Sequence, residues 1–135
     1  MSGESESHIA LVSGLANIVQ NRHGCNGNLA MYLDDQSRER ERPQRINGHL
    51  PDLYAENVPR TFVIIGEAKT RSDLLTKRSR LQIDSFLRYL NLFDLAFFYL
   101  AVPLLAKPVA TKLVREVGIG HVNVRAVVLT IDGVF

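Results

Sequence analysis

The chain has 135 residues, enough for one domain with a hydrophobic core and too few for two. A composition that is 46% hydrophobic and 22% charged excludes a wholly disordered chain, and the single cysteine excludes a disulfide framework or a multi-cysteine metal site. The net charge of +2 identifies no partner by itself, and neither a signal peptide nor a membrane-spanning apolar run is recognisable, so we expect a soluble, cytoplasmic protein without membrane contact.

The first predicted element is an amphipathic helix over residues 6–21, where apolar residues recur at helical spacing. The polar, glycine-containing stretch 23–28 ends this helix. A short strand is predicted at 29–33, and a charged loop follows at 34–43. The chain therefore begins with one helix that leads into a sheet.

Two further strands are predicted next in the chain. Residues 45–54 favour a strand that bends near Pro51, because proline cannot donate to a β-ladder. Residues 55–60 are expected to form a turn, and the apolar stretch 61–69 the third strand. Because short links join these three strands, we expect an antiparallel meander.

A long helix is predicted from Ser72 onward, with Asp73 in its first turn, where the helix dipole favours an anion. Gln82 falls on the apolar face of this helix and is therefore expected to be a buried polar residue. The other residues of that face are Leu75, Phe86, Tyr89 and Phe93.

The last predicted elements are a strand at 95–102 parallel to the third strand, a helix at 108–117 and a closing strand at 123–131. The order of elements predicts an α/β fold, a single domain over residues 1–135 in which helices flank a mixed central sheet. The apolar closing segment 127–135 raises the hypothesis of a homodimer.

Acidic residues lie around the third strand, which is apolar on both faces until its end. Glu67 and Lys69 follow the apolar run at i, i+2 spacing, so their side chains leave the same face. If Asp52 ends the second strand, its carboxylate converges with that of Glu67, and the Ala68 carbonyl offers a further oxygen ligand. Hard oxygen ligands with room for water suit Mg²⁺ or Mn²⁺.

Two neighbouring side chains are expected to support this site. Lys69 can hold a water molecule and offset developing negative charge, and Gln82 can orient that water or Lys69. The alternative is a structural ion pair of Glu67 with Lys69 or an arginine, with Asp52 as a turn residue.

These residues resemble the core motif of the PD-(D/E)XK nuclease superfamily, with Pro51-Asp52 followed by Glu67-Ala68-Lys69 after an apolar strand. The superfamily core of helix, three strands, helix and strand is similar to the predicted order over roughly residues 5–103. Gln82 followed by Phe86 is similar to the helix motif of RecB-like and virus-type replication-repair nucleases, which usually ends in tyrosine.

The resemblance implies a single-domain, restriction-endonuclease-like sandwich and assigns roles to the site. Asp52 and Glu67 would bind the metal, Lys69 would assist the nucleophilic water and Gln82 would support them. Many members also carry an acidic residue in the first helix, for which Glu6 is the candidate here. The size is similar to that of stand-alone Holliday junction resolvases.

Basic residues are concentrated around this site, which favours a polyanion as the partner. Taken singly, each also fits a solvated surface position. Eleven of the 16 basic residues lie in the middle of the chain: Arg38, Arg40, Arg42, Arg45, Arg60, Lys69, Arg71, Lys77, Arg78, Arg80 and Arg88. The expected nucleic-acid contacts are Arg38, Arg40, Arg42, Arg45, Arg71, Lys77, Arg78 and Arg80.

The sequence therefore predicts a Mg²⁺- or Mn²⁺-dependent nuclease that hydrolyses DNA phosphodiester bonds, first as an endonuclease on branched or duplex DNA and next as a restriction-type enzyme. Two alternatives stay open: a non-catalytic nucleic-acid-binding module on the same fold, and the nuclease domain of a larger repair or restriction protein. His8, His23 and His121 have no partner at metal-ligand spacing, and no role is predicted for them.

Overall fold

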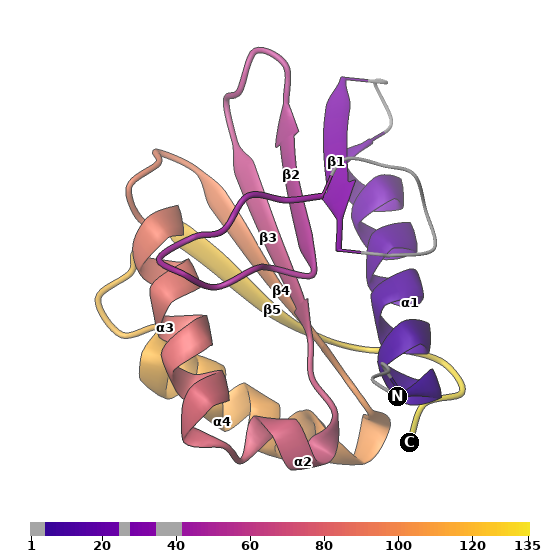
Figure 1. The fold of residues 1–135 in the computed structure, drawn as a ribbon. Coiled ribbons are helices and arrows are strands. Elements are labelled where there is room, and N and C mark those ends of the chain that lie inside the picture. Colours follow the sequence, from indigo (N-terminus) through magenta and orange to yellow (C-terminus); the bar gives the residue numbers. More distant parts are fainter. Residues whose placement is uncertain (1–4, 25–27, 35–41) are drawn as a thin grey trace.

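A computed structural model describes residues 5–24, 28–34 and 42–135, and it shows one five-stranded sheet with helices on both faces (Figure 1). The elements are α1 (Glu6–His23), β1 (Leu29–Leu33), β2 (Leu53–Asn57), β3 (Val63–Ala68), α2 (Arg71–Leu74), α3 (Lys77–Leu90), β4 (Ala96–Val102), the 3₁₀ turn η1 (Leu104–Ala106), α4 (Lys107–Val117) and β5 (Val124–Thr130). The predicted α/β class with a mixed central sheet is confirmed.

The sheet follows the chain in the order β1-β2-β3-β4-β5. β1, β2 and β3 pair antiparallel, which confirms the predicted meander. β4 lies parallel to β3, and β5 lies parallel to β4. The sheet is therefore antiparallel on one side of β3 and parallel on the other.

The second strand was predicted in the wrong place. It runs from Leu53 to Asn57, whereas residues 45–54 were expected to form it and 55–60 to form a turn. Asn47 and Gly48 adopt positive φ values of 52° and 84°, and they close a tight bridge between Ile46 and His49. This turn takes residues 46–49 out of the sheet, and the polar end of β2 is retained as strand because β1 and β3 pair with it on both sides.

The predicted long helix is divided into α2 and α3. Thr76 is the N-cap of α3, and its hydroxyl accepts a hydrogen bond from the Ser79 N–H at 3.1 Å. The sequence predicted that Leu75 shares the buried face with Gln82 and Phe86. Because the helix restarts at Thr76, Leu75 instead lies outside α3 and is 73% exposed.

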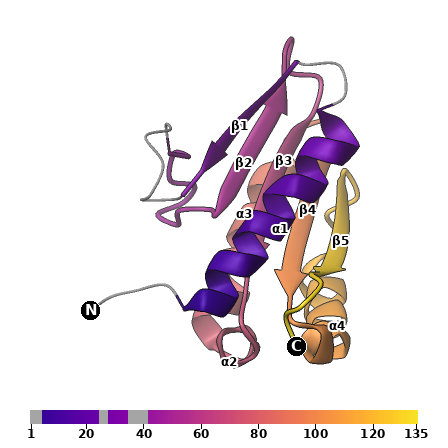
Figure 2. The same ribbon diagram turned by 90° about the vertical axis from the view of Figure 1, so that its right-hand side faces the viewer.

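Helices cover the two faces of the sheet as separate layers. Figure 2 shows α1 crossing one face, and the helices α3 and α4 lie on the other side. Leu11, Leu15 and Val19 of α1 are fully buried in the apolar cluster of the first face. Ile65 and Phe86 belong to the apolar cluster on the α3 and α4 face, so the central strands are buried on both sides, as predicted.

No helix in the described part of the chain is long and apolar enough to cross a membrane.

Gly66 is the point of closest approach between β3 and α1. A Cβ atom added there would lie 2.8 Å from Leu15 Cδ2, which is shorter than an ordinary van der Waals contact. Leu15 itself is fully buried, so it has little room to move away. The glycine therefore lets the first helix lie directly against the strand that carries Glu67.

We expect Gly66→Ala to lower the free energy of unfolding by about 1–3 kcal/mol, because the added methyl group overpacks the contact with Leu15. Urea unfolding of Gly66→Ala, Leu15→Ala and the double variant measures this effect. The double variant should be more stable than the sum of the two single losses predicts, because the shortened side chain makes room for the methyl group. Additive losses would contradict the proposed close contact.

Candidate active site

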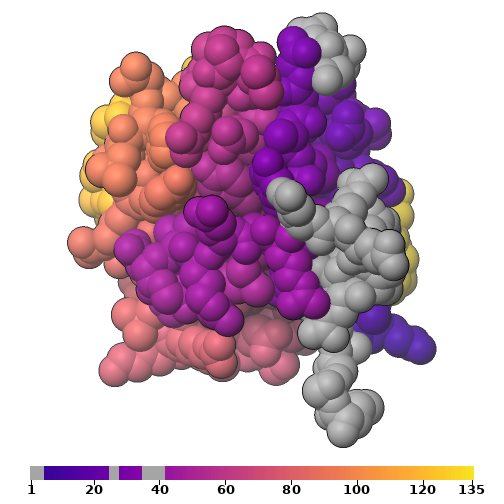
Figure 3. Space-filling model, turned by 45° about the horizontal axis from the view of Figure 1, so that its top comes forward, coloured from indigo at the N-terminus to yellow at the C-terminus, as the bar shows by residue number. Residues whose placement is uncertain are grey.

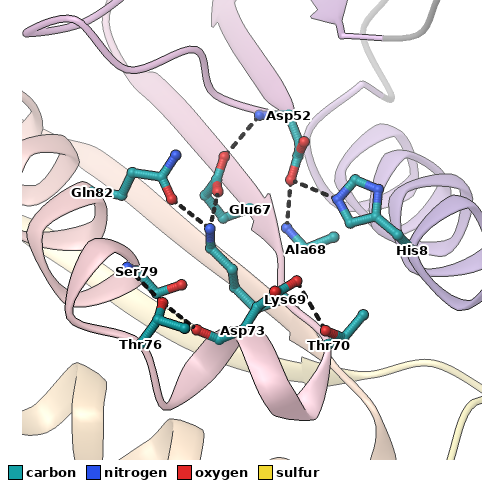
Figure 4. A network of polar contacts seen from close by, with 10 residues as sticks. All are labelled: His8, Asp52, Glu67, Ala68, Lys69, Thr70, Asp73, Thr76, Ser79 and Gln82. Carbon is teal, nitrogen blue, oxygen red and sulfur yellow. Dashed lines mark hydrogen bonds and ion pairs between the residues drawn. The ribbon is translucent and has the colours of Figure 1, made fainter. Parts of the chain in front are cut away.

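Two acidic side chains meet at the end of the β2–β3 pair. Leu53 pairs with Gly66, and continuing this register by one residue places Asp52 opposite Glu67. The Asp52 N–H donates to Glu67 Oε1 at 2.8 Å, and the Ala68 N–H donates to Asp52 Oδ2 at 2.8 Å (Figure 4). Asp52 precedes β2 and does not end a strand, contrary to expectation, yet it reaches Glu67 because the two strands run antiparallel.

Lys69 and Gln82 complete this group from the following elements. Lys69 Nζ lies 3.4 Å from Glu67 Oε2 and donates to Gln82 Oε1 at 2.5 Å. Gln82 projects from α3 and is buried, as the sequence predicted, and only 11% of the Lys69 side chain is exposed. The amide oxygen of Gln82 therefore fixes the ammonium beside the carboxylate.

The segment between β3 and α3 is fixed by its own hydrogen bonds. Thr70 Oγ1 donates to Asp73 Oδ2 at 2.9 Å, and Thr76 Oγ1 donates to the Asp73 carbonyl at 2.8 Å. The same Thr76 hydroxyl caps α3, the helix that carries Gln82. Figure 4 shows these residues directly beneath Lys69. The turn and the N-cap thus fix the start of α3 relative to the end of β3.

His8 is a site residue that sequence reasoning missed. It lies in the first turns of α1, and its Nε2 is 3.5 Å from Asp52 Oδ2 (Figure 4). Its ring is mostly buried, with 17% of the side chain exposed. No spacing pattern relates His8 to Asp52, since the contact depends on how α1 packs across the sheet. The one sign in the sequence that His8 belongs to a site is its position on the apolar face of the first helix.

Glu6, the predicted acidic residue of the first helix, has a different place. It is exposed in the first turn of α1, where it complements the helix dipole. In the described part of the chain, the α1 residue that contacts a site carboxylate is His8, which lies against Asp52.

Burial raises the pKa of the Glu67 carboxyl from its ordinary value of 4.5 to about 8. Desolvation is the largest cause, and the nearby Asp52 carboxylate adds to it. The Lys69 ammonium and the hydrogen bond from Asp52 act in the opposite direction and are too weak to cancel the cost. The site is therefore short of positive charge at the carboxylates.

Pro51 leaves a backbone oxygen available beside the two acids. Continuing the β2–β3 register places Pro51 opposite Ala68, and proline has no N–H with which to bond the Ala68 carbonyl. The Ala68 N–H points toward this side of the strand, where it bonds Asp52. In an extended strand the carbonyl of the same residue points the same way, so it faces the Asp52 side.

These donors fit a magnesium-type ion. In the described part of the chain, no cluster of three or more His, Cys, Asp and Glu side chains is placed to hold a metal. Magnesium, however, usually keeps several water ligands and binds proteins through only one or two carboxylates. Two buried carboxyl groups beside a backbone carbonyl, one of them with its pKa raised by burial, are consistent with such a site.

The predicted nucleic-acid contacts fall into three groups. Arg38 and Arg40 lie outside the described residues. Arg80 forms an ion pair with Glu116 of α4 at 3.3 Å, so part of its charge is used within the protein. The remaining predicted cations are exposed: Arg42, Arg45, Arg71, Lys77 and Arg78.

No family model matches the sequence, and neither a curated protein nor a solved structure is significantly similar to it.

Without divalent metal, we expect the stability of the folded chain to fall as the pH rises through the range in which Glu67 ionises. The pKa of Glu67 is raised in the folded state, so folding favours the protonated carboxyl. The stability of the folded state with respect to Glu67 is therefore highest below about pH 4.5 and is lost as the pH rises through about 8. Urea unfolding in EDTA across this range should show wild type losing stability relative to Glu67→Gln, by roughly 1.4 kcal/mol for each unit of pKa shift. A difference that does not change with pH would contradict the raised pKa.

Proposed function

We propose that the chain is a divalent-metal-dependent nuclease of the PD-(D/E)XK type that hydrolyses DNA phosphodiester bonds. The observation that carries this proposal is one connected group of side chains. Asp52 bonds Glu67, and Lys69 lies between Glu67 and Gln82 and contacts both. Support also comes from the order of elements from α1 to β4, which is the order of the superfamily core. The restriction-endonuclease-like sandwich is proposed on the same grounds.

Asp52, Glu67 and the Ala68 carbonyl would hold Mg²⁺ or Mn²⁺. When bound, such an ion supplies positive charge that polarises a phosphate and lowers the pKa of a coordinated water. Because burial leaves the ionised Glu67 carboxylate poorly stabilised, a cation bound beside it would be favourable. Keeping two acidic side chains buried side by side costs stability, and functional sites commonly carry this kind of cost.

Lys69 is the proposed partner of the attacking water. Its ammonium is a donor held by Gln82, so it can orient a water molecule and offset the negative charge that develops on the phosphate. Gln82 acts as a positioning residue, because its amide reaches Lys69. His8 can similarly hold the orientation of Asp52 from the opposite helix.

A substrate backbone can approach across an open depression of about 1010 Å³ that reaches the site at His8, the residue in contact with Asp52. Arg71 and Asp73 also line it, and Lys77 and Arg78 lie exposed at the start of α3. Arginine and lysine contacts with phosphates are largely independent of base sequence and weaken with salt. An endonuclease acting on branched or duplex DNA fits this arrangement, and association of two copies stays a prediction.

One observation favours the alternative of a non-catalytic nucleic-acid-binding module. Lys69 already forms an ion pair with Glu67, and two backbone N–H groups bond the carboxylates, so the acids have protein partners. Cleavage and binding assays on the same variants separate the two functions.

We expect Mg²⁺- or Mn²⁺-dependent cleavage of branched or duplex DNA, and we expect Glu67→Ala or Lys69→Ala to reduce it by at least about 100-fold. The measurement is conversion of labelled substrates with EDTA as the blank. Lys112→Ala, an exposed lysine of α4, is the matched control and should cleave like wild type. Absence of metal-dependent cleavage on duplex, branched and single-stranded substrates would refute the enzyme, and retained binding by the variants would then support the binding module.

We also expect Mn²⁺ to raise the melting temperature of wild type and not that of Glu67→Gln, because a ligand that binds only the folded state stabilises it. The stabilisation should increase with pH, since the Glu67 carboxyl, whose pKa burial raises, must lose its proton before it can bind the ion. Thermal unfolding with and without Mn²⁺ at several pH values measures both effects. Asp132→Asn, an exposed acid outside the site, should respond like wild type.

A further inference from the structure

A second hollow, of about 510 Å³, lies beside the candidate active site. It is on the face of β1 and β2 toward α3, next to the segment that precedes β2. In Figure 3 this segment, in purple, lies between the β2–β3 hairpin in magenta and the helices below it. The side chains that matter here are three tyrosines and three arginines, Tyr32, Tyr54, Tyr89, Arg42, Arg45 and Arg60.

The tyrosines come from three different elements and form a connected aromatic lining. The ring centroids of Tyr32 and Tyr54 are 6.4 Å apart, as are those of Tyr54 and Tyr89. The Tyr54 and Tyr89 hydroxyls lie 3.3 Å apart, and burial raises the pKa of Tyr54, so its hydroxyl stays protonated at neutral pH. All three side chains are half-buried, which leaves part of each ring open to the hollow.

Among the described residues that line the hollow, basic side chains outnumber acidic ones. Glu56 is the acid among these described residues, and it is paired with Arg60 at 3.6 Å. Arg60 also donates to the Tyr54 hydroxyl at 3.3 Å. Arg42 has Asp34 at 4.0 Å, and Arg45 donates to the Gly48 carbonyl at 3.2 Å, yet both residues are exposed, with 49% of the Arg42 side chain accessible. Flat aromatic faces beside excess cations suit a ligand that is both planar and anionic.

The position of the hollow relates it to the proposed chemistry. Tyr54 of β2 follows Asp52 by two residues, a distance of about 7 Å along an extended chain. Tyr89 follows Gln82 by two turns of α3, about 10 Å along the helix. A strand bound at the carboxylates would therefore have the hollow within reach of a neighbouring nucleotide.

We propose that this hollow binds one unpaired nucleotide, with its base among the tyrosines and its phosphate on the arginines. The inference rests on the proposed function in that this nucleotide belongs to the strand that is cut, and it specifies the substrate as DNA with unpaired nucleotides next to the cleaved bond. A base inside a duplex has both faces stacked and its edge paired, so it enters such a hollow only after leaving the stack. Single-stranded segments present their bases at no such cost.

The test is binding in EDTA, where no metal-dependent cleavage takes place. The chain has no tryptophan, and three of its four tyrosines line the hollow, so intrinsic tyrosine fluorescence reports directly on its occupancy. Deoxythymidine monophosphate, a short oligothymidylate and a blunt duplex are titrated separately. We expect quenching by the oligothymidylate, weaker binding of the mononucleotide, and the weakest effect from the duplex.

Matched variants assign the effect to the hollow. Tyr32→Ala should weaken oligothymidylate binding roughly 10-fold, whereas Tyr32→Phe, which keeps the aromatic face, should bind like wild type. Arg45→Gln should also weaken binding, and Arg125→Gln, an exposed arginine of β5 at the opposite edge of the sheet, should not. Because the fluorescence of variants that lose a tyrosine changes, anisotropy of labelled oligothymidylate is measured in parallel.

Three outcomes would overturn the proposal: equal binding by wild type and Tyr32→Ala, tighter binding of the blunt duplex, or a mononucleotide bound as tightly as the oligothymidylate, which would indicate a free nucleotide as ligand. Failure here remains distinct from failure of the nuclease. If the protein cleaves DNA and Tyr32→Ala binds oligothymidylate like wild type, only the proposed nucleotide site is refuted. If binding depends on Tyr32 and no metal-dependent cleavage is found, only the proposed hydrolysis is refuted.

Discussion

The burial of two carboxylates side by side is the constraint on which the rest of the structure depends. Asp52 and Glu67 are 8% and 2% exposed, and neither is stable there without compensation. Two backbone N–H groups, the Lys69 ammonium and His8 provide it in part. The raised pKa of Glu67 shows that this compensation is incomplete. A bound Mg²⁺ or Mn²⁺ would complete it, and this is why we propose a catalytic site here in place of a structural ion pair.

The surrounding elements are placed so that this group is held rigidly. Gly66 lets α1 lie against β3, which brings His8 to Asp52, and the Thr76 cap fixes the start of the helix that carries Gln82. The neighbouring strand β2 and the helix α3 then continue into the aromatic hollow through Tyr54 and Tyr89. One scaffold thus positions both the proposed hydrolytic site and the proposed nucleotide site.

Much of the fold could be predicted because its signals are local. Helical periodicity located α1, Pro108 and Gly118 marked the ends of α4, continuous apolar runs located β3 and β4, and short links indicated the meander. The errors came where tertiary pairing overrides local preference. β2 includes polar residues that read as a turn, and the helix after β3 is interrupted at Leu75, where the Thr76 cap restarts it.

The sequence by itself determined the order of the elements and the group of Asp52, Glu67, Lys69 and Gln82, because apolar runs and their flanking polar residues are visible along the chain. Only the tertiary structure decided which distant residues join them. His8 reaches Asp52 through the packing of α1, and Tyr54 meets Tyr89 across 35 residues. No periodic pattern encodes such contacts, since they arise from the way in which helices and strands lie against one another.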